Sequence, residues 1–367
     1  MDTLFTPGPV MMDPASLEAG SLQMTYHRTA AFSTTILNCQ RMIKVAAGAA
    51  ASDRVVMLTA SGTAAMEAAV LNLVPPGTAA HWVNGGDFGR RFGEICRCHG
   101  MAEVEIRLRP GRRATPADLP EPSGPGGVML VNHHETSTGT LHDLGILSAH
   151  CRAHGMLLVV DAIGSFLADP LSMTEHGVDA LLFSSQKALG LPPGLSFIIL
   201  NGRAVARARG ARPRSYYLDL RRYLEDGERG QTPFTPAVGI VRQLEGRLAA
   251  ILELGAEQAV AAVARLAADF RRRIRGLPFR VFPDHPSNAV TALEPTGGIA
   301  PDTYVRRLRE HGCVVCPNGG ELGRVIFRVG HLGALTTRDN ARLAAALRSV
   351  AGEARRPGVV TGWAAAR

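Results

Sequence analysis

The sequence predicts an α/β protein with a mostly parallel central sheet flanked by helices, followed by a smaller α+β domain. Short apolar runs alternate with helical patterns between Val55 and Leu200, which is typical of parallel strands joined by helices. A chain of 367 residues is longer than one ordinary hydrophobic core absorbs, so two domains are expected. We place the large domain at residues 14–250, the small domain at 1–13 and 251–350, and a flexible tail at 351–367.

Polar residues close the predicted strands of the large domain. Asn84, Asn132, Asp161 and Ser184 each follow an apolar run, and Lys187 comes shortly after the last of them. In an open parallel sheet the carboxyl ends of the strands meet at one edge, and ligands bind there. The sequence therefore predicts a functional site at this edge of the sheet.

Asp161 and Lys187 have the chemistry that a pyridoxal phosphate (PLP) cofactor requires. A lysine amine forms a Schiff base with the cofactor aldehyde, and an aspartate keeps the pyridine nitrogen protonated so that the ring accepts the electrons of a substrate carbanion. Taken alone, an Asp after a strand is often a cap or turn residue, and a Lys after Ser-Ser-Gln is often an exposed loop residue. Their joint placement at strand ends favours the cofactor interpretation, with both residues catalytic.

An anion site is predicted where the strand ending at Leu58 passes through a turn of small residues into a helix. Ser61, Gly62 and Thr63 lie at the start of that helix. Free backbone N–H groups and the helix dipole face an anion there, and the two hydroxyls add donors. The sequence offers no good GxGxxG fingerprint elsewhere, which weakens a dehydrogenase interpretation.

Composition limits the other classes of function. Hydrophobic residues make up 46% and charged residues 20% of the chain, and no apolar run approaches the length of about 18 residues that suggests a membrane span. The first residues show no signal-peptide pattern, so we expect a cytoplasmic protein without a membrane partner. A formal charge of +8 suits anionic substrates. Because the arginines are spread over many helices and no aromatic-plus-basic motif is present, we expect no nucleic-acid partner.

The six cysteines are too few and too scattered to predict a disulfide framework, and they fit a reducing compartment. Cys313 and Cys316 have the C-x-x-C spacing, but no second pair of ligands completes a zinc site. We therefore expect no metal. The basic stretch from Arg203 to about Gly230 is expected to be irregular.

Five motifs follow one another over nearly the whole chain: SGTAAMEAA, HHETSTGTL, VVDAIGS, SSQKAL-x-x-PPG and FRVGHLG. The sequence resembles the class V aminotransferases of PLP fold type I, among them the alanine:glyoxylate, serine:pyruvate, 2-aminoethylphosphonate:pyruvate and pyridoxamine:pyruvate enzymes. The resemblance implies a homodimer with shared active sites. It implies transfer of an amino group from a small amino acid or related amine to a 2-oxo acid such as pyruvate or glyoxylate.

The same resemblance implies the residues that hold the cofactor. Phe88 is expected to stack on the pyridine ring, although it could instead anchor the next helix to the core. Glu135 is expected to support the site rather than to act in catalysis. The cofactor-binding residues are predicted to be Ser61, Gly62, Thr63, Phe88, Thr136, Asp161, Gln186, Lys187 and Thr235, the last reaching the phosphate of the partner subunit.

Four residues are expected to bind substrate. Gly8 lies in a Pro-Gly-Pro segment that crosses the mouth of the site in the family. His27 and Arg28 are implied to reach the partner's site, where the alternative is a helix-entry turn with Thr29 as its cap. Arg328 matches the arginine that clamps the substrate carboxylate, because a planar guanidinium fits two oxygens.

Two rival functions stay open. A cysteine desulfurase or lyase on the same fold needs a nucleophilic cysteine, and Cys316 is the candidate, with a buried hydrophobic role as its alternative. A non-catalytic regulator or binding protein of PLP fold is supported only by the charge. Lys187, Asp161 and Arg328 argue against both. The Tyr26-His27-Arg28 sequence also departs from the aminophosphonate enzymes, which puts that substrate in doubt.

Overall fold

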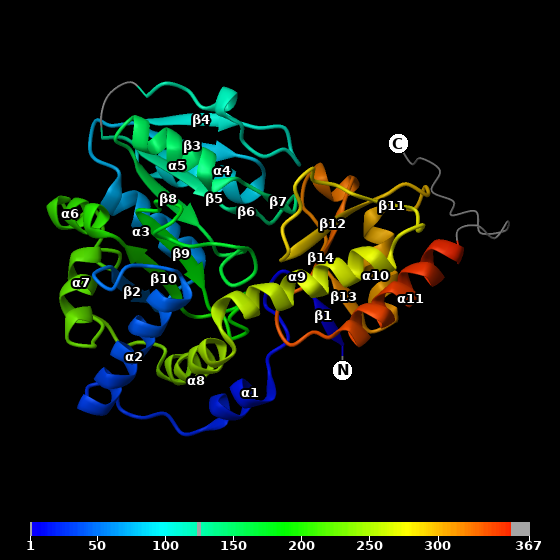
Figure 1. Cartoon of the computed structure of the whole chain (residues 1–367), viewed down its shortest axis with the longest axis horizontal. Coiled ribbons are helices and arrows are strands. Elements are labelled where there is room, and N and C mark those ends of the chain that lie inside the picture. Colours follow the sequence, from blue (N-terminus) through cyan, green and yellow to red (C-terminus); the bar gives the residue numbers. More distant parts are fainter. Residues whose placement is uncertain (1, 123–125, 354–367) are drawn as a thin grey trace, which may run out of the picture.

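The computed structural model describes residues 2–122 and 126–353, and it confirms the predicted fold class. Figure 1 shows two lobes, which we call the large lobe and the small lobe. The large lobe contains a seven-stranded sheet with helices on both faces. The small lobe contains a three-stranded sheet, a two-stranded sheet and helices. Helices α8 (Val238–Leu254) and α9 (Ala256–Arg273) lead from one lobe to the other.

The remaining elements follow in chain order. The strands are β1 (Thr3–Phe5), β2 (Arg54–Leu58), β3 (Ala80–Asn84), β4 (Glu103–Arg107), β5 (Val128–Asn132), β6 (His134–Glu135), β7 (Thr140–Leu141), β8 (Leu157–Asp161), β9 (Ala180–Ser184), β10 (Ser196–Leu200), β11 (Phe279–Val281), β12 (Val290–Pro295), β13 (Cys313–Val315) and β14 (Phe327–Gly330). The other helices are α1 (Pro14–Ser21), α2 (Ala30–Ala46), α3 (Gly62–Leu73), α4 (Asp87–Cys98), η1 (Pro116–Asp118), α5 (Leu144–Ala153), α6 (Gly202–Gly210), α7 (Leu220–Glu228), α10 (Pro301–Glu310), η2 (Leu322–Arg324) and α11 (Thr337–Glu353).

The large sheet has the strand order β2-β10-β9-β8-β5-β3-β4. Its neighbours from β9 to β4 are parallel, and β10 is antiparallel to both β9 and β2. The parallel strands β3, β5, β8 and β9 end at Asn84, Asn132, Asp161 and Ser184 respectively, as the polar residues of the sequence predicted. Four polar side chains therefore lie along one edge of the sheet.

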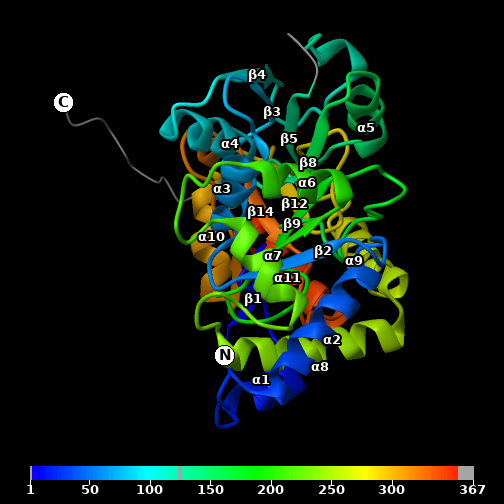
Figure 2. The same ribbon diagram turned by 90° about the vertical axis from the view of Figure 1, so that its left-hand side faces the viewer.

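Side-chain alternation places these four residues on the same face. In β8, Leu158 and Val160 belong to the core beneath α2, α5 and α8, whereas Leu157 and Val159 belong to the core beneath α3 and α4. Successive side chains of a strand point to opposite faces, so Asp161 continues the second set. Figure 2 shows α3 and α4 on one side of the sheet and α5 on the other. The site therefore faces the N-terminal ends of α3 and α4.

The expectation that the stretch from Arg203 to Gly230 is irregular is wrong, because α6 and α7 occupy most of it. The side chain of Asp219 accepts a hydrogen bond from the N–H of Arg221 and caps α7. The buried residues of α7, Leu220, Tyr223, Leu224 and Gly227, recur at helical spacing. The charged residues that lie between them made this helical pattern of apolar side chains hard to recognise in the sequence.

The small lobe has its own hydrophobic core, and the beginning of the chain belongs to it. Strand β1 pairs in parallel with β13, and Phe5 lies in a core with Phe270, Tyr304, Phe327 and Leu347. Helix α11 runs to Glu353, so the first residues of the expected tail, 351–353, are helical. The rest of that tail, 354–367, lies outside the described residues.

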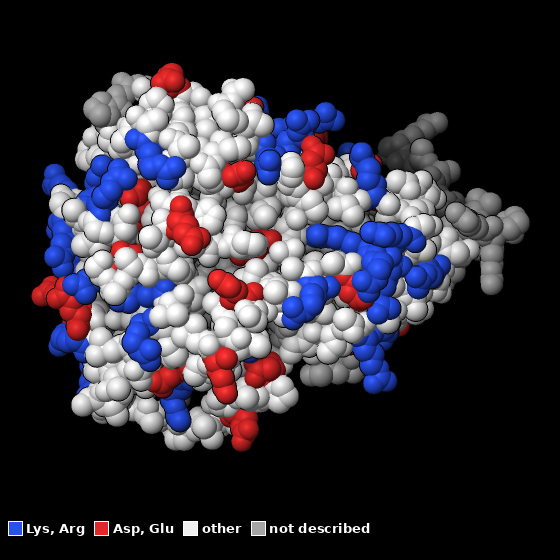
Figure 3. All heavy atoms as spheres, viewed as in Figure 1, with Lys and Arg blue, Asp and Glu red and all other residues white. Residues whose placement is uncertain are grey.

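The surface carries both signs of charge. Figure 3 shows Lys and Arg side chains gathered over the small lobe and along the opposite edge of the large lobe, with acidic side chains between them. Among the described residues, no helix combines the length and the apolar character needed to cross a membrane. The absence of a nucleic-acid partner stays a prediction.

Candidate active site

Asp161 ends β8 and is 5% exposed. One of its carboxylate oxygens accepts a hydrogen bond from the N–H of Ile163 at 2.8 Å, and among the described residues the other has no donor. Burial raises the pKa of Asp161 to about 7, and the charge of Glu135 adds to this rise; the Ile163 bond and the positive charges of Lys187 and Arg91 oppose it. A cationic N–H group beside the free oxygen would stabilise the carboxylate.

Lys187 lies in the tight turn that follows β9. The turn is closed by hydrogen bonds from the N–H of Gly190 to the Lys187 carbonyl at 2.9 Å and from the N–H of Leu191 to the Ser185 carbonyl at 3.1 Å. Burial lowers the pKa of the Lys187 amine to about 8, and the charge of Asp161 opposes this effect. Lys187 is therefore a buried amine within electrostatic range of the aspartate.

The N-terminus of α3 forms the predicted anion cup. The side chain of the N-cap, Ser61, makes no capping hydrogen bond. Gly62 leaves no space for a side chain, because a Cβ atom there would overlap Cδ1 of Ile163. The hydroxyl of Ser184 lies beside Gly62, is buried, and has no partner among the described residues. The first turn of a twelve-residue helix and two hydroxyls without partners are thus free for an anion.

Phe88 is held in place by Glu135. The Glu135 carboxylate accepts hydrogen bonds from the N–H groups of Phe88 at 3.3 Å and Gly89 at 2.8 Å, at the start of α4. It also accepts from the Asn132 side chain at 2.8 Å and from the Ser137 hydroxyl at 2.5 Å. These hydrogen bonds of the Glu135 carboxylate are all with groups of the protein, so Glu135 holds the start of α4 in place.

Thr136, Gln186 and Gly8 lie around Lys187 and the loop after Asp161. A Cβ atom on Gly164 would lie 2.8 Å from the Thr136 hydroxyl oxygen, so this glycine keeps space at the hydroxyl. A Cβ atom on Gly8 would lie 2.7 Å from Cδ of Lys187 and 2.8 Å from the carbonyl oxygen of Gln186. The Pro-Gly-Pro segment therefore passes directly over Lys187.

Arg328 reaches the large lobe from β14 of the small lobe. Its guanidinium donates to the carbonyl of Thr136 at 3.3 Å, to the carbonyl of Pro317 at 2.6 Å and to the sulfur of Cys316 at 3.1 Å. Its Nε atom is buried and has no partner among the described residues. Arg328 also lowers the pKa of Lys187. At least the Nε donor of this guanidinium is thus left for a ligand.

His27, Arg28 and Thr235 do not join this group within one chain. Arg28 donates to the side chain of Gln231 and to the carbonyl of Thr232, both at 2.9 Å. The Gln231 side chain donates in turn to the His27 carbonyl at 3.5 Å, and Thr235 is exposed. We call residues 21–29 and 231–235 the outer segments. We call the residues around Asp161 and Lys187 the cofactor edge: Ser61–Thr63, Phe88, Arg91, His134, Thr136, Asp161, Ile163, Ser184, Lys187 and Arg328.

Sequence reasoning missed three residues of the cofactor edge. Ile163 borders the anion cup, and its place two residues after Asp161 was the available signal. Arg91 donates to the Thr63 hydroxyl at 3.2 Å and follows Phe88 by one helical turn. His134 is buried, and burial lowers its pKa to about 3, although a hydrogen bond with the backbone of Gly164 opposes this shift. No sequence signal separated His134 from a core histidine.

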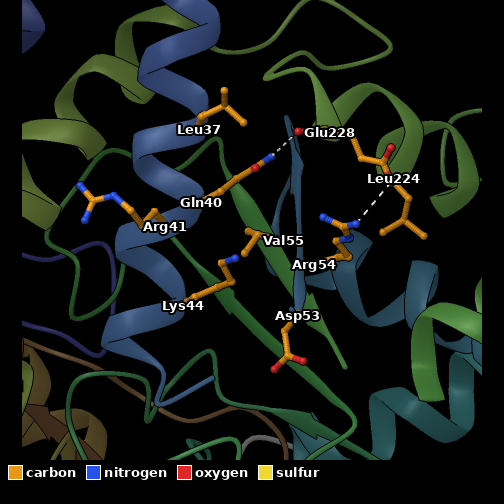
Figure 4. A pocket seen from close by; sticks show the side chains of 10 residues that line it. Leu37, Gln40, Arg41, Lys44, Asp53, Arg54, Val55, Leu224 and Glu228 are labelled. Atoms are coloured by element: carbon orange, nitrogen blue, oxygen red, sulfur yellow. Dashed lines mark hydrogen bonds and ion pairs between the residues drawn. The ribbon is translucent and has the colours of Figure 1, made fainter. Parts of the chain in front are cut away.

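A cleft of about 560 Å³ lies beside the site, between the residues after β3 and the Gly319–Leu322 stretch of the small lobe. A separate hollow of about 190 Å³ lies between α2 and α7. Figure 4 shows that Lys44, Arg54 and Glu228 line it, and Arg54 pairs with Glu228 at 3.6 Å. That hollow contains none of the predicted site residues.

These residues fit PLP. The α3 N-terminus suits a phosphate, the free oxygen of Asp161 suits a protonated ring nitrogen, the Lys187 amine suits an aldehyde, and Phe88 offers a ring face. The fit rests on the unpartnered Ser184 hydroxyl and on the space kept by Gly62 and Gly164. Fold and site together define a PLP-dependent enzyme.

Comparison with known proteins gives the family. The family model described as Aminotransferase class-V matches residues 15–321. An alanine–glyoxylate aminotransferase from Oryctolagus cuniculus is 30% identical over 94% of this chain and 91% of its own. A solved aspartate aminotransferase from Thermus thermophilus superimposes with a TM-score of 0.89 at 32% identity, covering 96% of this chain and 99% of that one. The chain belongs to the class V aminotransferase family, and it is a PLP-dependent transaminase.

A further relative carries a different name. A Synechococcus protein named as the small subunit of a soluble hydrogenase is 32% identical over 95% of this chain and 93% of its own. Among residues 2–122 and 126–353, no group of three or more His, Cys, Asp or Glu side chains could hold a metal ion.

Proposed function

We propose that the protein transfers an amino group from a small amino acid or related amine to a 2-oxo acid such as pyruvate or glyoxylate. One observation carries the proposal: Arg328 reaches from the small lobe to the Thr136 carbonyl at 3.3 Å, and its charge and that of Asp161 both act on the Lys187 amine. An amine near both a carboxylate and a guanidinium can act on a bound α-amino acid whose carboxylate Arg328 holds. The domain division at residues 13 and 250 belongs to this proposal, with the smaller part carrying Arg328.

Lys187 is the base in this proposal. Burial lowers its pKa to about 8, so a useful fraction of the amine is neutral near pH 7. The neutral amine would take the proton from the α-carbon of the amino donor and pass it to the cofactor carbon that had carried the aldehyde. With the 2-oxo acid bound, the same amine would move a proton in the opposite direction. Gly8 covers the lysine side chain and limits access of water to it.

Asp161 holds the proton of the ring nitrogen. When bound, PLP supplies an aldehyde that captures the donor amine and a ring that withdraws electrons from the α-carbon. The free carboxylate oxygen of Asp161 would accept the ring N–H, and the bond from Ile163 keeps the carboxylate in place. Thr136 and Gln186 would bind the ring substituents, and Ser61, Gly62 and Thr63 the phosphate.

Arg328 holds the carboxylate shared by donor and acceptor. Its guanidinium is fixed by the carbonyls of Thr136 and Pro317, which leaves Nε for one carboxylate oxygen. A fixed planar fork loses little freedom on binding, so it recognises both substrates by the same group. The alanine–glyoxylate and aspartate enzymes named above both act on substrates with such a carboxylate.

A homodimer is proposed because the outer segments expose apolar side chains. Leu22, Met24 and Tyr26 are 53%, 63% and 67% exposed, and Tyr216 is 69% exposed. Contiguous exposed apolar side chains are typical of interfaces. In a dimer, His27, Arg28 and Thr235 would serve the site of the other subunit, Arg28 near the distal end of the substrate and Thr235 at the phosphate. The cytoplasmic location likewise stays a prediction.

The Cys316 thiol gains no support as a nucleophile. Cys316 pairs its backbone with that of Arg328 through hydrogen bonds of 2.9 and 2.8 Å, so it lies on a bridged strand extension and not on a free loop. Its sulfur is a partner of the Arg328 guanidinium. Sulfide release from cysteine, measured beside amine transfer, separates the desulfurase from the transaminase.

The experiment that tests the proposal is a scan of amines with the PLP-loaded protein. Donors are ranked by their loss of the absorbance of the lysine-bound cofactor, and each is then paired with pyruvate or glyoxylate. We expect transfer that depends on both the donor and the 2-oxo acid. Release of ammonia or sulfide without any requirement for a 2-oxo acid would contradict it.

Sharing of sites is tested with mixed dimers. Lys187→Ala subunits retain Arg28, and Arg28→Ala subunits retain Lys187, so each heterodimer has one site with both residues if Arg28 serves the partner. Random pairing then restores on the order of a quarter of the wild-type sites. If Arg28 serves its own subunit, no intact site forms, and mixing leaves activity at the average of the two homodimers.

A further inference from the structure

Arg91 occupies a position in the site that neither the core nor an ion pair explains. Its Nη1 atom donates to the Thr63 hydroxyl at 3.2 Å, and its guanidinium carbon lies 4.9 Å from the centre of the Phe88 ring. Thr63 is in the first turn of α3. The neighbouring Arg90 pairs with Asp87 and Glu94, whereas none of the ion pairs among the described residues includes Arg91.

Arg91 and Asp161 attract each other without forming an ion pair, and at the start of α3 a cation is unfavourable unless a further anion binds. The N-terminus of a helix carries a partial positive charge, so a cation there is disfavoured by about 0.3–1 kcal/mol. Because the Thr63 oxygen accepts from Arg91, its own O–H is free to donate elsewhere. The buried Ser184 hydroxyl beside Gly62 also has no partner among the described residues. A cation and two free hydroxyl donors therefore meet at one helix terminus.

We propose that Arg91 is a ligand of the PLP phosphate, acting with the N–H groups of the α3 N-terminus and the hydroxyl of Thr63. This inference rests on the proposed function and assigns a further cofactor-binding residue within it. Phosphate of PLP carries close to two negative charges, which the helix terminus alone does not balance. Arg91 supplies a full positive charge from the same chain, so the phosphate is held before any partner residue contributes.

A different role would leave the same contacts. Arg91 could act only as a brace that presses the Phe88 ring toward the pyridine, through the cation–π contact. The two roles differ in what they recognise: a brace serves any pyridoxal ring, whereas a phosphate ligand serves only the phosphorylated cofactor.

The experiment compares PLP with pyridoxal, which lacks the phosphate. Dissociation constants of both are measured by absorbance titration of the cofactor-free protein and its Arg91→Gln and Arg90→Gln variants. Pyridoxal closes partly to an internal hemiacetal, but it does so equally for every variant. The change in the ratio of the two dissociation constants from one variant to the next therefore isolates the phosphate. A lost charge-assisted hydrogen bond weakens PLP by about ten- to a hundredfold, while pyridoxal stays within about threefold. Arg90→Gln, on the exposed side of the same helix, changes neither.

Each outcome decides the proposal. Equal weakening of PLP and pyridoxal binding by Arg91→Gln identifies a brace and overturns the phosphate role. Unchanged binding of both ligands also overturns the phosphate role. Selective weakening of PLP, with partial recovery in Arg91→Lys, supports it, and a shift of the phosphorus NMR signal of bound PLP in Arg91→Gln gives a second readout. Failure of the wild-type protein to bind PLP would instead contradict the proposed function itself.

Discussion

The cofactor edge and the outer segments differ in how far one chain completes them. At the cofactor edge, Asp161 is 5% exposed and hydrogen-bonded by its own chain, and Lys187 lies under Gly8. In the outer segments, Arg28 is exposed and bonds only to the neighbouring Gln231 and Thr232. The first region is complete except for a ligand, whereas in the second the side chains of Arg28 and Tyr26 are left exposed.

This difference separates two kinds of unsatisfied groups. Unpartnered buried atoms such as Ser184 Oγ and Arg328 Nε cost free energy unless a ligand binds them, so they indicate a small-molecule site. Exposed apolar side chains such as Tyr26 lose water contact only when a large surface covers them, so they indicate another subunit. Substitutions at the cofactor edge should therefore act on every substrate, and those in the outer segments on some.

The largest effect is expected from Lys187→Ala. Loss of both the covalent anchor and the proton-transfer base should lower turnover by about 10⁴-fold or more, while PLP still binds noncovalently. Lys44 and Lys187 are the only lysines in the sequence, so borohydride reduction followed by peptide mapping gives a clear answer. Lys44→Arg is the matched control and should retain activity; a reduced adduct on Lys44 would contradict the assignment.

Asp161→Asn is expected to lower the rate by several orders of magnitude with a modest loss of cofactor. A neutral amide cannot hold the ring proton by charge, and a buried charge-assisted hydrogen bond is worth roughly 3 kcal/mol or more, which gives at least a hundredfold. Steady-state rates and the PLP dissociation constant are measured together. Near-normal turnover in this variant would show that Asp161 has only a structural role.

The strands could be predicted from the sequence because each run of apolar residues ends where the buried part of the strand ends. Each of the parallel strands β3, β5, β8 and β9 ends at the polar residue that followed its run, and alternation then places Asp161 on the face of α3. The fold class needed nothing more. The functional roles of Asp161 and Lys187 stay predictions, although the structure brings the two residues together.

The other features of the site could not be predicted, because they depend on contacts between segments that are distant in the sequence. Arg91 reaches Thr63 from another helix, and Arg328 reaches the Thr136 carbonyl from another lobe, so no local pattern shows either bond. Helix α7 was missed for a different reason, because its charged residues outnumber the apolar side chains that it buries. Conversely, His27 and Arg28 were predicted from a motif that a single chain does not complete.

Arg328→Ala and Arg28→Ala should separate the two regions by substrate. Arg328→Ala should weaken the donor and the 2-oxo acid alike, because both carry the carboxylate that the guanidinium holds. Arg28→Ala should affect mainly substrates with a distal anion. Each loss should be roughly 2–4 kcal/mol where the ion pair is well desolvated.

Kinetics with pyruvate, glyoxylate and a dicarboxylic or phosphonate partner measure both variants. Arg41→Ala, on the outward face of α2, provides an arginine control away from the cofactor edge. If Arg28→Ala changes all substrates equally or none, the two-anion interpretation is wrong. His27 and Arg28 are then a helix-entry turn, with Thr29 capping α2 through its bond from the N–H of Phe32 at 3.2 Å.

The smallest effect concerns the protonation of Lys187 in the cofactor-free protein. Burial lowers the pKa of its amine from 10.5 to about 8, so the reactive neutral form grows as pH rises, reaches one half near pH 8 and is nearly complete near pH 9. Acetylation of Lys187 by trace acetic anhydride should therefore level off near pH 9, whereas an unperturbed lysine, whose pKa is about 10.4, keeps gaining reactivity well beyond that pH. Peptide mapping separates Lys187 from Lys44.

Because the charge of Asp161 raises the pKa of Lys187, Asp161→Asn should move the plateau of the acetylation rate to lower pH. A reactivity of Lys187 that keeps rising beyond pH 9 in the wild-type protein would show that the amine is solvated, and that its place beside Asp161 does not prepare it as a base.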